Sequence, residues 1–167
     1  MCNNLLKNEA EVINTKDGAT IYRYARNNQN VNISILEDAI IAMKDAVYIY
    51  FFALDVEGAN IPKLQKAIVN TKDLYNICCF ARDVKGADVA ELEKITIQSG
   101  NAEAIFRFAK EVKGANLEKL SSAIIQTKNA EYIFKFGENI FGIDIFKVYN
   151  GLKSTDKNLA RRFWFGY

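Results

Sequence analysis

Histidine is absent from this 167-residue chain, and cysteine and proline are scarce. The missing histidine removes the commonest general base and the commonest neutral metal ligand. Of the three cysteines, Cys2, Cys78 and Cys79, two are adjacent, so neither a disulfide framework nor a zinc-site spacing can be drawn. The chain also lacks a phosphate-binding glycine loop and a nucleophile elbow. These absences argue against an enzyme, and we expect no catalytic residue, no cofactor and no metal.

Long apolar runs and a strong net charge are missing too. No stretch approaches the roughly 18 consecutive apolar residues of a membrane span, and residues 1–10 lack the apolar core of a signal peptide. We therefore expect a cytoplasmic protein without a membrane partner. The 22 basic and 20 acidic side chains give a formal charge of +2, which is little electrostatic reason to favour nucleic acid.

A 28-residue unit recurs five times without a gap, and it organises the rest of the chain. In each unit an isoleucine, an aromatic ring three residues later and a leucine or valine twelve residues after that return at the same positions. The recurring residues are Ile21, Ile49, Ile77, Ile105 and Ile133, then Tyr24, Phe52, Phe80, Phe108 and Phe136, then Leu36, Leu64, Leu92, Leu120 and Val148. The units span 16–43, 44–71, 72–99, 100–127 and 128–155, with partial capping units at 1–15 and 156–167. Such self-similarity is typical of a stacked repeat array.

Each unit predicts two helices, which we call A and B. Helix A, about 13 residues with helical apolar spacing, is expected to follow a Thr or Ser N-cap and to end at a glycine suited to left-handed backbone. These N-caps are Thr15, Thr71, Ser99 and Thr127, and the glycines are Gly58, Gly86, Gly114 and Gly142. Helix B follows an Asn or Asp N-cap at Asn32, Asn60, Asp88, Asn116 and Asp144. The fold class expected is all-α, a right-handed α-solenoid forming a single domain over 1–167, in which stacked neighbours complete the core.

The unit consensus, with its recurring Ile, Phe and Leu positions, is roughly DAxYIYxFAxDVKGANIxKLxxAIIxT. In architecture the chain resembles the α-solenoid class of HEAT, tetratricopeptide and Sel1-like arrays. The consensus is similar to repeats in uncharacterised proteins of low-GC bacteria and their phages. This resemblance covers nearly the whole chain and carries no catalytic residue. It implies a small binder suited to inhibiting a host defence enzyme, such as an anti-CRISPR protein.

An apolar stripe on the second unit is the first candidate binding surface. Val47, Phe51 and Leu54 follow an i, i+4, i+7 spacing on the helix A face that carries polar groups in most other units. Tyr75 and Cys79 occupy matching positions in the third unit, where we expect Cys79 to face water. Contiguous exposed apolar groups often mark a contact surface. The alternatives are that the N-terminal segment folds over them or that they are tolerated singly.

The aromatic C-terminal end is the second candidate surface. Two outcomes are open: the tail helix packs over the fifth unit and its rings seal the end, or some rings stay exposed for a partner or a second copy. Arg161 and Arg162 would flank the exposed rings, and Trp, Tyr and Arg are enriched at interface hot spots. The partner-binding residues predicted on the two surfaces are Val47, Phe51, Leu54, Tyr75, Cys79, Arg161, Arg162, Trp164 and Tyr167.

These features favour non-catalytic binding of another protein, because a solenoid offers an extended surface and the chain lacks the groups that chemistry needs. The alternative is a nucleic-acid-binding helical repeat protein. Lysines on helix B, at Lys63, Lys66, Lys94 and Lys119, would then contact phosphates, although carboxylates are interleaved with them.

Overall fold

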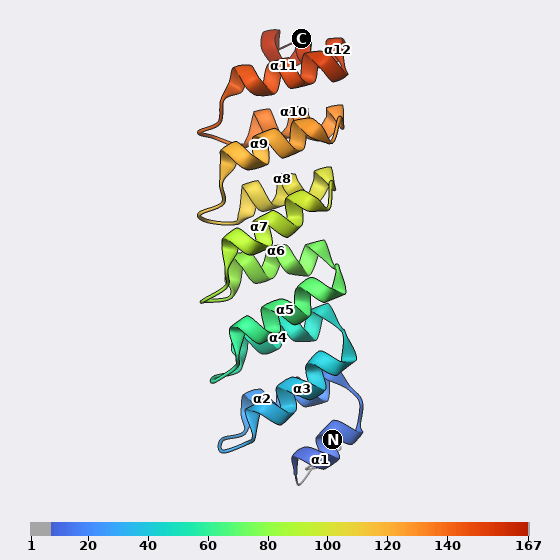
Figure 1. Cartoon of the computed structure of the whole chain (residues 1–167), viewed down its shortest axis with the longest axis vertical. Helices are drawn as coiled ribbons and strands as arrows, with labels where there is room; N and C mark the ends of the chain where they lie inside the picture. Colours follow the sequence, from blue (N-terminus) through green and yellow to red (C-terminus); the bar gives the residue numbers. More distant parts are fainter. Residues whose placement is uncertain (1–7, 167) are drawn as a thin grey trace. The chain divides into compact units, whose positions relative to one another are not determined.

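The computed structural model describes residues 8–166, and the regular elements in that range are all α-helices. They fall into two compact units, which we call unit 1 (up to Asp88) and unit 2 (from Val89). The 28-residue units of the sequence are called repeats from here on. Figure 1 colours unit 1 from blue to green and unit 2 from yellow-green to red. The helices of unit 1 are α1 Glu9–Asn14, α2 Gly18–Asn27, α3 Ile33–Met43, α4 Ala46–Asp55, α5 Ile61–Thr71 and α6 Leu74–Asp83. Those of unit 2 are α7 Val89–Gln98, α8 Ala102–Glu111, α9 Leu117–Gln126, α10 Ala130–Asn139, α11 Ile145–Thr155 and α12 Lys157–Phe165.

Unit 1 is built from helical hairpins. Helix α2 packs on α3 and α4 on α5, as Figure 1 shows, and helices at the same repeat position pack on each other: α2 on α4, α4 on α6, and α3 on α5. Ile49, Phe52 and Leu64 are completely buried between these layers. The inward-facing positions predicted from the repeat are therefore confirmed at these residues.

Unit 2 follows the same plan. Helix α8 packs on α10 and α9 on α11, and α12 packs on both α10 and α11. Phe108, Leu120, Phe136 and Val148 have no exposed surface. The contacts of α12 confirm that the C-terminal segment packs over the fifth repeat.

The start of helix A, which corresponds to α2, α4, α6, α8 and α10, differs from the prediction. The side chains that cap these helices belong to Asp17, Asp45, Asp73, Asn101 and Asn129, two residues after the expected threonine or serine position. The Thr71 hydroxyl instead donates to the Ile68 carbonyl at 2.6 Å and accepts from the Asp73 amide at 3.2 Å. The Thr71 side chain therefore caps the end of α5 and not the start of α6. Lys72, which follows Thr71, has a left-handed backbone with φ 60°, and the chain changes direction there. The Thr and Ser N-cap prediction was wrong by two residues.

Helix A is also shorter than predicted, at 10 residues in α8, so the glycine lies beyond its end. The Ala115 amide donates to the Val112 carbonyl at 3.3 Å, which closes a β-turn with Gly114 at its third position. Gly114 has φ +85°, as a type II turn requires there, so the left-handed glycine is confirmed. Asn30 holds the equivalent position of the first repeat with φ 60°.

Helix B begins as predicted in most repeats, since Asn32, Asn60, Asn116 and Asp144 accept the amide three residues ahead. A second contact joins consecutive hairpins within each unit. The Asn60 amide donates to Glu37 Oε2 at 2.7 Å, and the Asn116 amide to Glu93 Oε2 at 2.5 Å. Buried acceptors thus tie the start of one helix B to the previous one.

Residues 8–166 contain no helix that combines the length and the apolarity needed to cross a membrane. The longest helices, α3, α5 and α11, have 11 residues each. The single-domain boundary 1–167 and the cytoplasmic location stay predictions.

Candidate protein-binding surfaces

Three large apolar side chains lie exposed on two helices that pack together in unit 1. On α4, Val47 is 42% exposed and Leu54 38%, with Phe51 half-buried between them on the same face. Tyr75, on α6, is 58% exposed. Because α4 packs directly against α6, we treat these four residues as one feature and call it the α4/α6 surface.

Phe51 is covered by aromatic neighbours. Its ring centroid lies 5.8 Å from that of Tyr22 on α2 and 5.2 Å from that of Tyr50. The described part of the N-terminal segment, α1, packs on α2 and α3 instead. The rings that cover Phe51 are therefore Tyr22 of the neighbouring repeat and Tyr50 of its own helix.

Cys79 does not belong to this surface, and the prediction that it faces water was wrong. Its residue is only 5% exposed. Arg23, Arg107 and Lys135 occupy the same repeat position and carry their charged ends outward on long side chains, whereas the cysteine side chain is too short to leave the packed layer. Cys78, at the repeat position of Tyr22 and Phe106, is 1% exposed. Cys2 lies outside the described residues.

Tyrosine–carboxylate pairs border the α4/α6 surface. The Tyr50 hydroxyl donates to Asp83 Oδ2 at 2.7 Å, and Arg82 Nη2 approaches the same oxygen at 2.7 Å. One repeat earlier, the Tyr22 hydroxyl donates to Asp55. Sequence reasoning missed these pairs, although one signal was present: both tyrosines precede an aspartate by 33 residues, one repeat plus five.

The environment keeps both members of the Tyr50–Asp83 pair in their ordinary protonation states. Burial, followed by the hydrogen bond to Asp83 and its charge, raises the pKa of Tyr50 to about 12. The Arg82 hydrogen bonds, with that from Tyr50, lower the pKa of Asp83. A neutral phenol therefore donates to an ionised carboxylate across the neutral pH range, which fixes both side chains beside the apolar surface.

The aromatic C-terminal end combines the two predicted outcomes. Phe163 packs edge-on against Phe134, at 5.8 Å between centroids, and so seals the end. Trp164 contacts Phe146 at 5.3 Å, yet these residues remain 42% and 62% exposed.

The two arginines predicted to flank this surface, Arg161 and Arg162, are both exposed. The Arg162 guanidinium lies 5.7 Å over the Phe134 ring, and Arg161 precedes it on α12. Tyr167 lies outside the described residues. The structure thus places Arg161, Arg162 and Trp164 on one short helix.

No protein-family model, curated protein or solved structure matches this chain. The resemblance to short two-helix repeats of bacterial and phage proteins therefore stays a prediction. Within residues 8–166, no three metal-binding side chains gather into a site.

Proposed function

We propose that this protein binds another protein, without catalysis, through the α4/α6 surface. The observation that supports it most strongly is the exposure of Val47, Leu54 and Tyr75 on two packed helices. The matching positions in unit 2 carry charged residues instead, at Glu103, Lys110, Glu131 and Glu138. Apolar groups beside tyrosine and arginine are the composition that interface centres favour.

The proposed architecture is a right-handed α-solenoid of five 28-residue repeats with a partial repeat at each end. Packing of same-position helices within each unit supports it, because α2, α4 and α6 stack in one unit and α8, α10 and α12 in the other. An extended row of helices offers broad binding faces, which suits a protein partner.

Nucleic-acid binding is the second candidate, and the lysine ladder that would carry it is interrupted. Lys63 Nζ lies 2.6 Å from Asp38 and 2.9 Å from Glu37, so its charge is already balanced. These two hydrogen bonds, that with Asp38 first, raise the pKa of Lys63. A lysine whose charge is balanced by carboxylates contributes little to phosphate binding, and this observation favours a protein partner over nucleic acid.

The chain itself supplies the test substitutions. Leu54→Arg and Tyr75→Glu introduce residues that other repeats already carry at these positions, Arg26 and Arg82 for the first and Glu103 and Glu131 for the second. We expect the double variant to keep its melting temperature and to lose capture of a partner from lysates of the source organism or its host. Glu138→Arg, a charge change at the Leu54 position of unit 2, is the matched control and should capture normally.

Undiminished capture by the double variant would show that the α4/α6 surface does not bind the partner. The inhibitor role implied by the resemblance is a special case of this proposal. It is tested by adding the protein to the captured partner and assaying the partner's own activity.

A further inference from the structure

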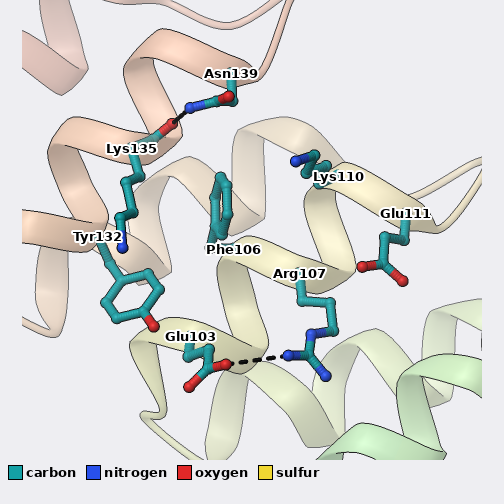
Figure 2. A pocket seen from close by; sticks show the side chains of 8 residues that line it. All are labelled: Glu103, Phe106, Arg107, Lys110, Glu111, Tyr132, Lys135 and Asn139. Carbon is teal, nitrogen blue, oxygen red and sulfur yellow. Dashed lines mark hydrogen bonds and ion pairs between the residues drawn. The ribbon is translucent and has the colours of Figure 1, made fainter.

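A groove with a volume of about 390 Å³ lies between α8 and α10 in unit 2. Figure 2 shows the Phe106 ring in it, with Lys110 on the α8 side and Lys135 and Asn139 on the α10 side. Phe106 and Tyr132 are half-buried, with ring centroids 6.1 Å apart. The groove therefore offers aromatic surface beside cationic side chains.

The equivalent residues of unit 1 show which charged group pairs with these positions. Three repeats earlier, Phe106, Lys110 and Asn139 correspond to Tyr22, Arg26 and Asp55. There, Asp55 on α4 accepts the Tyr22 hydroxyl of α2, and Arg26 Nη1 lies 3.9 Å from the same carboxylate. The next pair, Tyr50 on α4 and Asp83 on α6, repeats the tyrosine–carboxylate contact. In unit 1 a carboxylate from the following helix thus supplies the negative charge.

Unit 2 has lost that internal carboxylate. Asn139 carries no charge, and its Nδ2 turns back to donate to the Lys135 carbonyl at 2.7 Å. Phe106 has no hydroxyl to anchor an acid. Lys110 Nζ lies 5.7 Å over the Phe106 ring and forms no ion pair with any residue that the structure describes.

The other two cations of the groove are already paired. Arg107 Nη2 lies 3.0 Å from Glu103, and Lys135 Nζ lies 2.6 Å from Glu131. One cation, Lys110, is therefore left for an outside anion. It occupies the repeat position of Arg26, which lies 3.9 Å from the Asp55 carboxylate in unit 1.

We propose that the α8/α10 groove binds a single Asp or Glu side chain of a partner polypeptide, with the carboxylate at Lys110 and an adjacent apolar side chain against Phe106 and Tyr132. A peptide fits better than a nucleic acid, because Glu103 and Glu111 also line the groove and would repel successive phosphates. The inference shares with the proposed function only the idea that the partner is a protein. It does not depend on the α4/α6 surface.

The test compares two synthetic peptides on the full-length protein, acetyl-Gly-Leu-Asp-Phe-Gly-amide and its Asn-for-Asp analogue. Binding is followed by chemical-shift changes of the labelled protein in NMR titrations. We expect the acidic peptide to bind about two- to fivefold more tightly at about 0.15 M salt, since Lys110 is exposed, and the ratio to shrink at about 1 M. Lys110→Gln should reduce the ratio to about one, whereas Lys113→Gln, an exposed lysine just beyond the same helix, should leave it unchanged.

Asn139→Asp gives the groove the carboxylate that Asp55 supplies in unit 1. We expect this variant to bind the acidic peptide no better than the neutral one, since its own carboxylate then occupies Lys110. Equal affinity of the two peptides for the wild-type protein, or a ratio that survives Lys110→Gln, overturns the proposal. So does an oligothymidylate that displaces the acidic peptide through Lys110, because the groove then binds phosphate.

The two proposals fail separately. The Leu54→Arg/Tyr75→Glu variant should retain the peptide preference, because its changes lie in unit 1. A wild-type protein that shows no peptide preference and yet captures its partner through Leu54 and Tyr75 refutes the groove alone.

Discussion

Replacing Glu93 with alanine should destabilise the protein by about 3 kcal/mol. The residue is 4% exposed, and its carboxylate accepts the Asn116 amide at 2.5 Å. Loss of a hydrogen bond to a charged group costs about 1.5 to 3 kcal/mol, and each buried methylene removed adds up to about 0.8 kcal/mol. Partial repacking and water entry at the loop offset some of this sum.

The chain offers its own control for this substitution. Gln65 occupies the Glu93 position one repeat earlier, is 4% exposed, and accepts the Asp88 amide through Oε1 at 2.8 Å. Glu93→Gln should therefore keep the contact and cost less than about 1 kcal/mol, since only the charge assistance is lost. Urea unfolding of both variants, followed by circular dichroism, measures the difference directly.

The comparison separates the possible contributions of Glu93. Equal losses in the alanine and glutamine variants would show that the charge, and not the amide contact, stabilises the junction. No loss in either variant would refute the reasoning that buried acceptors tie consecutive B helices together. A changed slope of unfolding against urea would indicate that the variant no longer unfolds in one two-state transition or that the compactness of its denatured state has changed.

Three further predictions concern other parts of the chain. Lys72 has φ 60°, so Lys72→Gly should stabilise the protein by about 0.5 to 1 kcal/mol. Lys66→Gly, inside α5, should instead destabilise it by about 1 kcal/mol. Equal effects of the two substitutions in thermal melts would show that the left-handed backbone at Lys72 is not strained. Because the pKa of Tyr50 is raised to about 12, the stability that neutral Tyr50 adds is complete below pH 10 and is lost as the pH rises to about 12. The fall of the urea midpoint at alkaline pH should therefore be smaller in Tyr50→Phe than in the wild-type protein. An equal fall in both proteins would refute this prediction. If Phe146 and Trp164 join two copies, sedimentation equilibrium should show self-association that Trp164→Ser removes, and a monomeric wild-type protein would reject this role.

The all-helical class and the inward-facing residues followed from the sequence alone. A repeated spacing of apolar residues reports which face of a helix is buried, and it correctly placed Phe52 and Phe108 in the core. Local chemistry was readable for the same reason: Asn60 caps its own helix, and Gly114 sets its own turn. Each of these signals acts over a few residues along the chain.

The surfaces were decided by tertiary structure. Cys79 is buried although longer side chains at its position reach solvent, and Phe51 is half-buried because Tyr22 packs beside it. Contacts such as Tyr50 with Asp83 join residues 33 apart. Lys110 is left without a carboxylate because the α10 side of the groove carries Asn139, whose amide bonds to the Lys135 carbonyl. Exposure and pairing depend on what the neighbouring helix presents to each side chain, and a single repeat's sequence does not contain that information.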